Sequence, residues 1–250
     1  MDALRITGIA LNVADVERAT SFYAVLGFTP VGAGLMDFRG TRLELTAATG
    51  APYPEPRAAN DLWFQHFAVA VADIEAATAA VLGAGATPIS RGGPQFLPPN
   101  TGSVTAYKFR DPDGHPLELS LIPGSAWLRD AAAGAVFLGV DHTAVAVADL
   151  AASQGWYEAR GFREIGRSRN TGPEQDRLDG LAAVVVDIVA LAPPGPGPHL
   201  ELLCYRTPPA AAARRIADGD IAATRTLVTG KGSAIDLDGH RIVSADPTTA

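Results

Sequence analysis

One eight-residue stretch occurs three times in this chain, and no other feature constrains the fold as strongly. HFAVAVAD at 66–73 returns as HTAVAVAD at 142–149 and, near the N-terminus, as GIALNVAD at 8–15. In each copy, alternating apolar and β-branched residues are followed by an aspartate, a pattern typical of a strand that leads into a helix. The repetition predicts a fold built from several copies of one unit.

The segment after each aspartate has the marks of a short helix. Asp15, Asp73 and Asp149 stand at the N-cap position, where a carboxylate accepts hydrogen bonds from the free N–H groups of the first helical turn. Apolar residues then recur at helical spacing. A glycine, which ends helices readily, lies twelve residues after each aspartate: Gly27, Gly85 and Gly161. We therefore expect a helix directly after each repeated strand.

Three further strand candidates follow each predicted helix, and the last carries the letters LEL, at 43–45, 117–119 and 200–202. Each unit therefore reads β-α-β-β-β. The tail after Pro208 retains two candidate strands, ATRTLVTG at 223–230 and GHRIVSADP at 239–247, with no helix pattern between them. The expected fold class is α+β, with three clear units and a degenerate fourth. We expect two domains: residues 1–125 hold units one and two, and residues 135–250 hold units three and four.

Together these features resemble the vicinal oxygen chelate superfamily. The repeated units, the first strand that begins with histidine, and DPDGHPLELSLIP at 111–123 carry the resemblance, which covers residues 1 to about 206. It implies glyoxalase-like domains in which two units form a cup-shaped mixed sheet around a divalent metal ion. The superfamily includes glyoxalase I, methylmalonyl-CoA epimerase, extradiol dioxygenases and the fosfomycin and bleomycin resistance proteins, so membership alone does not fix the reaction.

The resemblance places metal ligands at the histidine position of the first strand and the glutamate position of the last. These two positions hold, unit by unit, Gly8 and Glu44, His66 and Glu118, His142 and Glu201, and Arg225 and Val243. If the middle units pair, His66, Glu118, His142 and Glu201 form one complete set, which suits Zn, Ni, Co, Fe or Mn. If the units pair in sequence order, Glu44 joins His66 and Glu118, and neither site is complete. We favour the middle pairing, in which Glu44 has no metal role.

The implied chemistry is Lewis-acid catalysis through a metal-bound enolate, with Glu118 or Glu201 removing a proton next to a carbonyl. We therefore predict a glyoxalase- or epimerase-like lyase or isomerase that acts on a small oxygenated substrate. Two alternatives stay open: an extradiol-type dioxygenase, and a non-catalytic ligand-binding or resistance protein. Asn170 and Arg177 are the candidate substrate-binding residues, because they lie in a polar stretch at 168–181 that would cover the cup.

Composition excludes other classes of function. The net charge of −7 argues against a nucleic-acid partner. The longest apolar run, 181–192, is interrupted by Asp187, and the N-terminus lacks the features of a signal peptide. A single cysteine, Cys204, suits a reducing compartment. We expect a cytoplasmic monomer or homodimer with a small-molecule substrate and no membrane contact.

Overall fold

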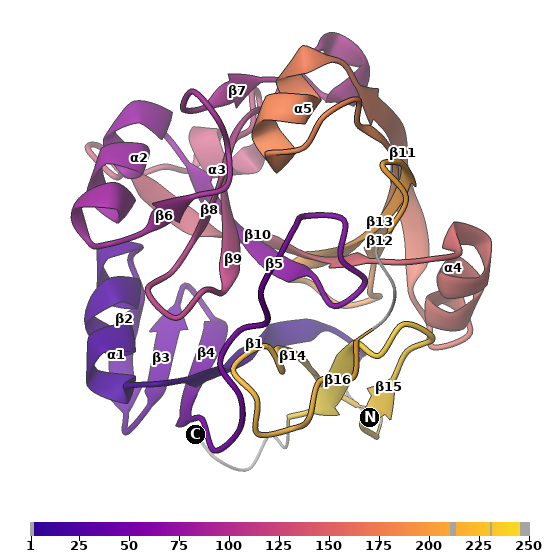
Figure 1. Cartoon of the computed structure of the whole chain (residues 1–250). Helices are drawn as coiled ribbons and strands as arrows, with labels where there is room; N and C mark the ends of the chain where they lie inside the picture. Colours follow the sequence, from indigo (N-terminus) through magenta and orange to yellow (C-terminus); the bar gives the residue numbers. More distant parts are fainter. Residues whose placement is uncertain (1–2, 211–213, 231, 246–250) are drawn as a thin grey trace.

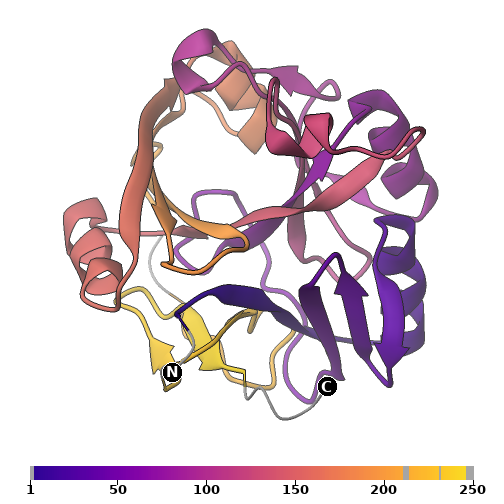
Figure 2. The same ribbon diagram turned by 180° about the vertical axis from the view of Figure 1, so that it is seen from behind.

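Two mixed sheets form the body of the molecule in a computed structural model that describes residues 3–210, 214–230 and 232–245 (Figures 1 and 2). This confirms the expected α+β class. The first sheet runs, in spatial order, β15 (Ala234–Ile235), β16 (Arg241–Ser244), β14 (Arg225–Val228), β1 (Ile6–Val13), β4 (Thr41–Ala47), β3 (Leu35–Phe38) and β2 (Thr29–Gly32). The second runs β11 (Arg163–Thr171), β12 (Val185–Ala192), β13 (His199–Thr207), β10 (Phe137–Ala146), β5 (Gln65–Val71), β9 (Pro116–Leu121), β8 (Thr105–Arg110) and β6 (Thr87–Pro88), with β7 (Gln95–Phe96) paired to β8.

The helices begin where the repeated aspartates predict. The side chains of Asp15, Asp73 and Asp149 accept backbone N–H groups at 3.0 Å, at the starts of α1 (Val16–Val25), α2 (Ile74–Gly83) and α4 (Leu150–Glu158). The predicted terminal glycines have φ between +95° and +97°, a conformation that glycine adopts without strain: Gly27, Gly85 and Gly161. The shorter helices are α3 (Ala126–Arg129), α5 (Pro173–Asp179) and the 3₁₀ turn η1 (Pro99–Thr101). None of the described helices is long and apolar enough to span a membrane.

The strand order confirms that the middle units pair. β5 runs antiparallel to β10, and each of them is flanked by the parallel strand that carries its LEL motif, β9 or β13. The outer units pair likewise through β1 and β14. Figure 1 shows the larger sheet curving so that β11 and β8 lie on opposite sides, with α5 near the rim.

The strand alternation separates the core from the cup. Phe67, Val69 and Val71 of β5 point into the largest hydrophobic cluster, which also takes in α1, α2 and the inner residues of β1 and β4. His66 therefore faces the opposite, concave side of its sheet. A second cluster joins β10, α4 and β13 to β14 and β16. Each sheet takes strands from both predicted domains, whereas the largest cluster comes mainly from the first, so the division at 125–135 stays a prediction. The number of repeat units also remains an interpretation of the sequence.

Candidate metal centre

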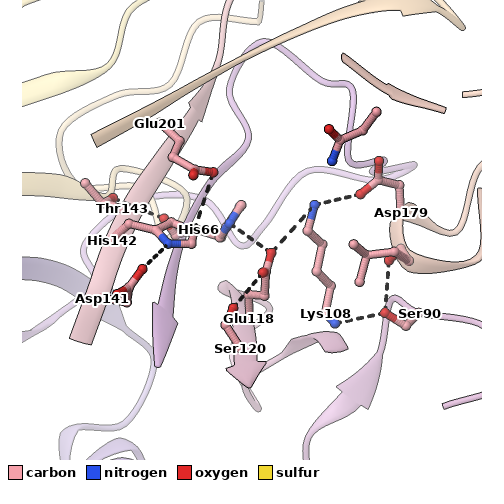
Figure 3. Close-up of polar contacts among 12 residues, drawn as sticks. His66, Ser90, Lys108, Glu118, Ser120, Asp141, His142, Thr143, Asp179 and Glu201 are labelled. Carbon is pink, nitrogen blue, oxygen red and sulfur yellow. Dashed lines mark hydrogen bonds and ion pairs between the residues drawn. The ribbon is translucent and has the colours of Figure 1, made fainter. Parts of the chain in front are cut away.

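Two imidazoles and two carboxylates face one another on the concave side of the larger sheet (Figure 3). His66 Nε2 lies 3.4 Å from Glu118 Oε2, and His142 Nε2 lies 3.7 Å from Glu201 Oε2. The two imidazole rings are 5.7 Å apart between centroids. Donor atoms of His66, Glu118 and His142 all lie within 4.8 Å of one another. Donors at bond lengths near 2 Å lie at most about 4 Å apart, so the two histidine–glutamate distances of 3.4 and 3.7 Å fit donors around one ion.

The arrangement follows from strand register. β9 places Glu118 opposite Ala68, two residues beyond His66 on β5. Likewise β13 places Glu201 opposite Ala144, two residues beyond His142 on β10. Because side chains two residues apart share a face, each glutamate reaches the same side of the sheet as its histidine.

His66 is buried, and neither ring nitrogen makes a well-formed hydrogen bond among the described residues; Nδ1 has no partner, and Nε2 has only the 3.4 Å contact with Glu118 Oε2. Burial lowers the pKa of His66, which favours the neutral imidazole with a free lone pair. An unpartnered buried polar group is costly to a protein. A cation bound to one of these nitrogens would remove that cost, so the donor set fits a divalent metal.

Glu118 is held by several partners. Ser120 Oγ donates to Glu118 Oε1 at 2.8 Å, and Lys108 Nζ lies 3.9 Å from Oε2. Burial alone would raise the pKa of Glu118, but His66 and Lys108 hold it well below its usual range. Lys108 also donates to Asp179 Oδ1 at 2.6 Å, and this contact joins the floor of the site to α5. Glu118 is therefore a fixed, ionised carboxylate.

His142 has a different environment. Its Nδ1 lies 3.0 Å from Asp141 Oδ2. Burial lowers the pKa of His142, but Glu201, Asp141 and Glu118 together raise it to about 9. His199 lies beside it, with Nε2 3.5 Å from Glu201 Oε1. The half-buried Glu201 is thus contacted by two imidazoles, and it is more exposed than Glu118.

These residues line a cavity of about 350 Å³. Apolar side chains make up much of its wall: Leu97, Val104, Ile122, Leu178, Ile188 and Leu203. Ser168, Asn170 and Gln175 add polar groups. The cavity can therefore take a small molecule that has both an oxygenated end and an apolar part.

The two candidate substrate residues occupy different places. Asn170, at the end of β11, is buried, lines the cavity and donates to Gln175 Oε1 at 3.1 Å. Arg177 does not line this cavity; its Nε donates to Gln95 Oε1 at 2.6 Å, which ties α5 to β7. A role in substrate binding stays a prediction for both, and only Asn170 is placed to contact a molecule in the cavity.

The outer pair of units holds no comparable set of donors among its described residues. Glu44 is partly exposed and lies 3.5 Å from Arg42 Nη1. Arg225 donates to Asn12 Oδ1 at 2.9 Å. The Asn12 amide in turn donates to the backbone carbonyls of Asp218 and Asp220, so an irregular segment covers this side of the smaller sheet.

Three charged or titratable residues of the cavity wall were not predicted from the sequence: Lys108, Asp141 and His199. His199 did have a signal, since it stands two positions before Glu201 on one strand and must share its face. Lys108 lies opposite Glu118 in the register of β8 and β9, but a lone lysine in the segment TAYKFR is only a weak signal. Asp141 should point away from the cavity on a regular strand.

Comparisons with known proteins agree with this architecture. Residues 5–119 match the family model of the Glyoxalase/Bleomycin resistance protein/Dioxygenase superfamily. Glyoxalase I from Zea mays has a similar structure, with a TM-score of 0.63 and 17% identity over 96% of this chain and 91% of that one. A candidate dioxygenase from Bacillus subtilis gives a TM-score of 0.58 and 13% identity over 98% and 86% of the two chains. At such identities the similarity shows the fold alone. No curated protein matches the sequence.

Proposed function

We propose that this chain is a divalent-metal-dependent lyase or isomerase, because residues 5–119 match the family model of the Glyoxalase/Bleomycin resistance protein/Dioxygenase superfamily. Its metal ligands would be His66, Glu118, His142 and Glu201. The convergence of these four side chains in one cavity, around the unpartnered nitrogens of His66, carries the proposal. Imidazole and carboxylate donors suit Zn, Ni, Co, Fe or Mn.

When bound, such an ion supplies Lewis-acid stabilisation to two neighbouring substrate oxygens. The protein contributes the base. Glu118 is fixed by Ser120 and Lys108, whereas the contacts of Glu201 with His142 and His199 are longer, at 3.7 and 3.5 Å. We assign proton abstraction next to the substrate carbonyl to Glu201, because the less restrained carboxylate can move towards the substrate. Glu118 then remains a ligand.

The cavity wall supports a small oxygenated substrate with an apolar substituent. The apolar side chains of Leu97, Val104 and Leu178 would contact the substituent. Asn170 and Gln175 would orient a second polar group of the substrate and exclude water from the reacting end.

One observation favours a second candidate, an extradiol-type dioxygenase. One group of donors within 4.8 Å of one another is His66, Glu118 and His142, which is the composition of a two-histidine, one-carboxylate iron site with open positions. In such a dioxygenase, Glu201 would not bind the metal and would instead accept and donate protons.

Metal content and reaction class test the proposal together. Protein purified without chelator is expected to hold about one divalent ion per chain by elemental analysis. A panel of thiohemiacetals, 2-substituted acyl thioesters and catechols should be converted in the first two groups without oxygen uptake. Oxygen consumption with a catechol would instead favour the dioxygenase. No metal after purification, and no binding of added Zn, Ni, Co, Fe or Mn, would leave only a ligand-binding role.

Variants test the ligand set. His66→Ala and His142→Ala should each lower metal affinity at least 100-fold, since each removes a donor. Glu201→Gln should weaken metal binding less than the alanine variants, because three ligands remain, and should lose most of the activity, because an amide cannot act as the base. Glu44→Gln is the matched control on the smaller sheet and should leave both near normal. A loss of metal in Glu44→Gln with retention in His142→Ala would contradict the proposed set.

A further inference from the structure

In strand β10, the regular alternation of side chains between the two faces of the sheet is interrupted at Asp141. Val140 pairs with Val69 and His142 pairs with Ala68 on β5, so Asp141 is an extra residue in the ladder. A bulge of this kind re-aims the side chain next to it. Asp141 and His142, neighbours that would point to opposite faces of a regular strand, consequently both line the same cavity.

Both oxygens of the Asp141 carboxylate are engaged. Oδ2 accepts from His142 Nδ1 at 3.0 Å, and Oδ1 accepts from Trp127 Nε1 at 2.7 Å. Trp127 belongs to α3 and lies against β10 at Gly139, where a Cβ atom would come within 2.5 Å of the indole ring. The glycine thus provides the space from which the indole reaches Asp141.

This contact makes the two histidines of the site unequal. Because Nδ1–H donates to Asp141, Nε2 is the nitrogen that faces Glu201 and the cavity, and its lone pair becomes available to a metal once Nε2 loses its proton. His66 has no such support, since neither of its nitrogens has a hydrogen-bond partner among the described residues.

We infer that Asp141 is a positioning residue, which fixes the orientation and tautomer of His142 for metal binding and is itself fixed by Trp127. The inference rests on the proposed metal role of His142. Replacing a residue that hydrogen-bonds a metal-binding histidine typically lowers the affinity for the metal by about 10–100-fold. Such a residue orients the imidazole and increases its basicity.

The test uses the full chain in metal-free form, titrated with Co²⁺ against a competing chelator and followed by visible absorption. Asp141→Ala and Asp141→Asn should weaken Co²⁺ binding by about 10–100-fold, with little change in band positions. Trp127→Phe, which keeps the ring but removes the N–H, should weaken it by less. Asp187→Asn is the matched control: it removes another carboxylate of the same sheet, paired with Arg169 and Arg206 instead, and should change affinity less than twofold.

Two results would overturn the inference. If the Asp141 variants bind Co²⁺ as tightly as the unchanged chain, the carboxylate does not support His142. If their bands change as expected for the loss of a ligand, Asp141 coordinates the metal directly, together with His142 and His199, whose donor atoms lie within 4.8 Å of its own.

A metal-free readout separates this inference from the proposed function. In the NMR spectrum of the apo protein, His142 Nδ1–H should give a low-field proton resonance that exchanges slowly with water and disappears in Asp141→Ala. If the unchanged chain binds no metal but shows this resonance, the proposed function fails while the Asp141–His142 pair stands. Absence of the resonance from the unchanged chain would refute the pair itself.

Discussion

At the scale of single residues, His142 should couple metal binding to pH. Burial lowers its pKa, but Glu201, Asp141 and Glu118 raise it to about 9, so the metal-free protein carries a charged imidazole at pH 7. A metal needs the neutral form. We expect uptake of Zn²⁺ at pH 7 to release about one proton from His142, and this release to vanish above about pH 9. Calorimetry in buffers of different ionisation enthalpy measures the number of protons released, and a release that does not change between pH 7 and pH 9 would contradict the role of His142.

The raised pKa of His142 also predicts how the stability of the metal-free protein changes with pH. A pKa raised on folding stabilises the folded state fully below the unfolded value of 6.5, and that stability is lost as the pH rises through about 9. The melting temperature of metal-free protein should therefore fall between these pH values. His142→Ala should flatten this part of the profile. A melting temperature that rises over this range would contradict the charged state of His142.

Residue by residue, the sequence predicted what obeys strand alternation and missed what does not. His66, Glu118, His142 and Glu201 recur at fixed positions of a repeated frame, and the resemblance to the vicinal oxygen chelate superfamily implied that these positions meet at one site. Asp141 lines the cavity only because of a bulge, and no local pattern marks a bulge when the extra residue is an ordinary aspartate. Lys108 depends on the pairing of β8 with β9 and on α5, which are contacts distant in sequence.

At the scale of elements, α5 shows how the polar stretch at 168–181 comes to cover the cavity. The sequence predicted that 168–181 lies over the cup, but not that it ends β11 and then forms a helix with Pro173 in its first turn. Several contacts join α5 to the segment that contains β6, β7 and β8. Ser90 Oγ donates to the Leu178 carbonyl at 2.9 Å, and the Arg177 carbonyl accepts from Arg91 N at 2.8 Å. α5 therefore links the two halves of the larger sheet across the cavity.

We predict that Arg177 acts on α5 as a tether. Arg177→Ala removes the hydrogen bond to Gln95, worth about 1–2 kcal/mol for a charged donor. Amide exchange in 173–179 should then become faster by about fivefold or more without any substrate present, as measured by mass spectrometry. Arg169→Ala, which removes an arginine of β11 that pairs with Asp187, is the control and should leave α5 unchanged. If amide exchange in 173–179 is unaltered in Arg177→Ala and the KM for an anionic substrate is higher, Arg177 binds substrate and does not tether α5.

At the scale of the whole molecule, the two halves are built on the same long-range contact. In the first half Tyr23 of α1 donates to Asp111 Oδ2 at 2.8 Å; in the second, Tyr157 of α4 donates to Asp236 Oδ2 at 2.9 Å. Each aspartate opens a turn that ends in Gly-His, and each histidine Nε2 contacts a backbone oxygen, at 2.9 Å for His115 and 2.8 Å for His240. The likeness of GHPLE and GHRIV was visible in the sequence. The tyrosine contacts were not, because they span 88 and 79 residues.

This correspondence predicts equal and independent effects of two substitutions. Tyr23→Phe and Tyr157→Phe each leave a buried carboxylate without its hydroxyl donor, which should lower the free energy of unfolding by about 1–3 kcal/mol. Because the two tyrosines belong to separate core clusters, the losses should add to within about 0.5 kcal/mol in the double variant. Co²⁺ affinity should not change, since neither hydroxyl contacts the site. Tyr107→Phe, at a ring stacked on Phe109, controls for hydroxyl removal in the core. Urea unfolding measures the four variants against the unchanged chain, and a loss confined to Tyr23→Phe would show that the second half does not depend on its counterpart contact.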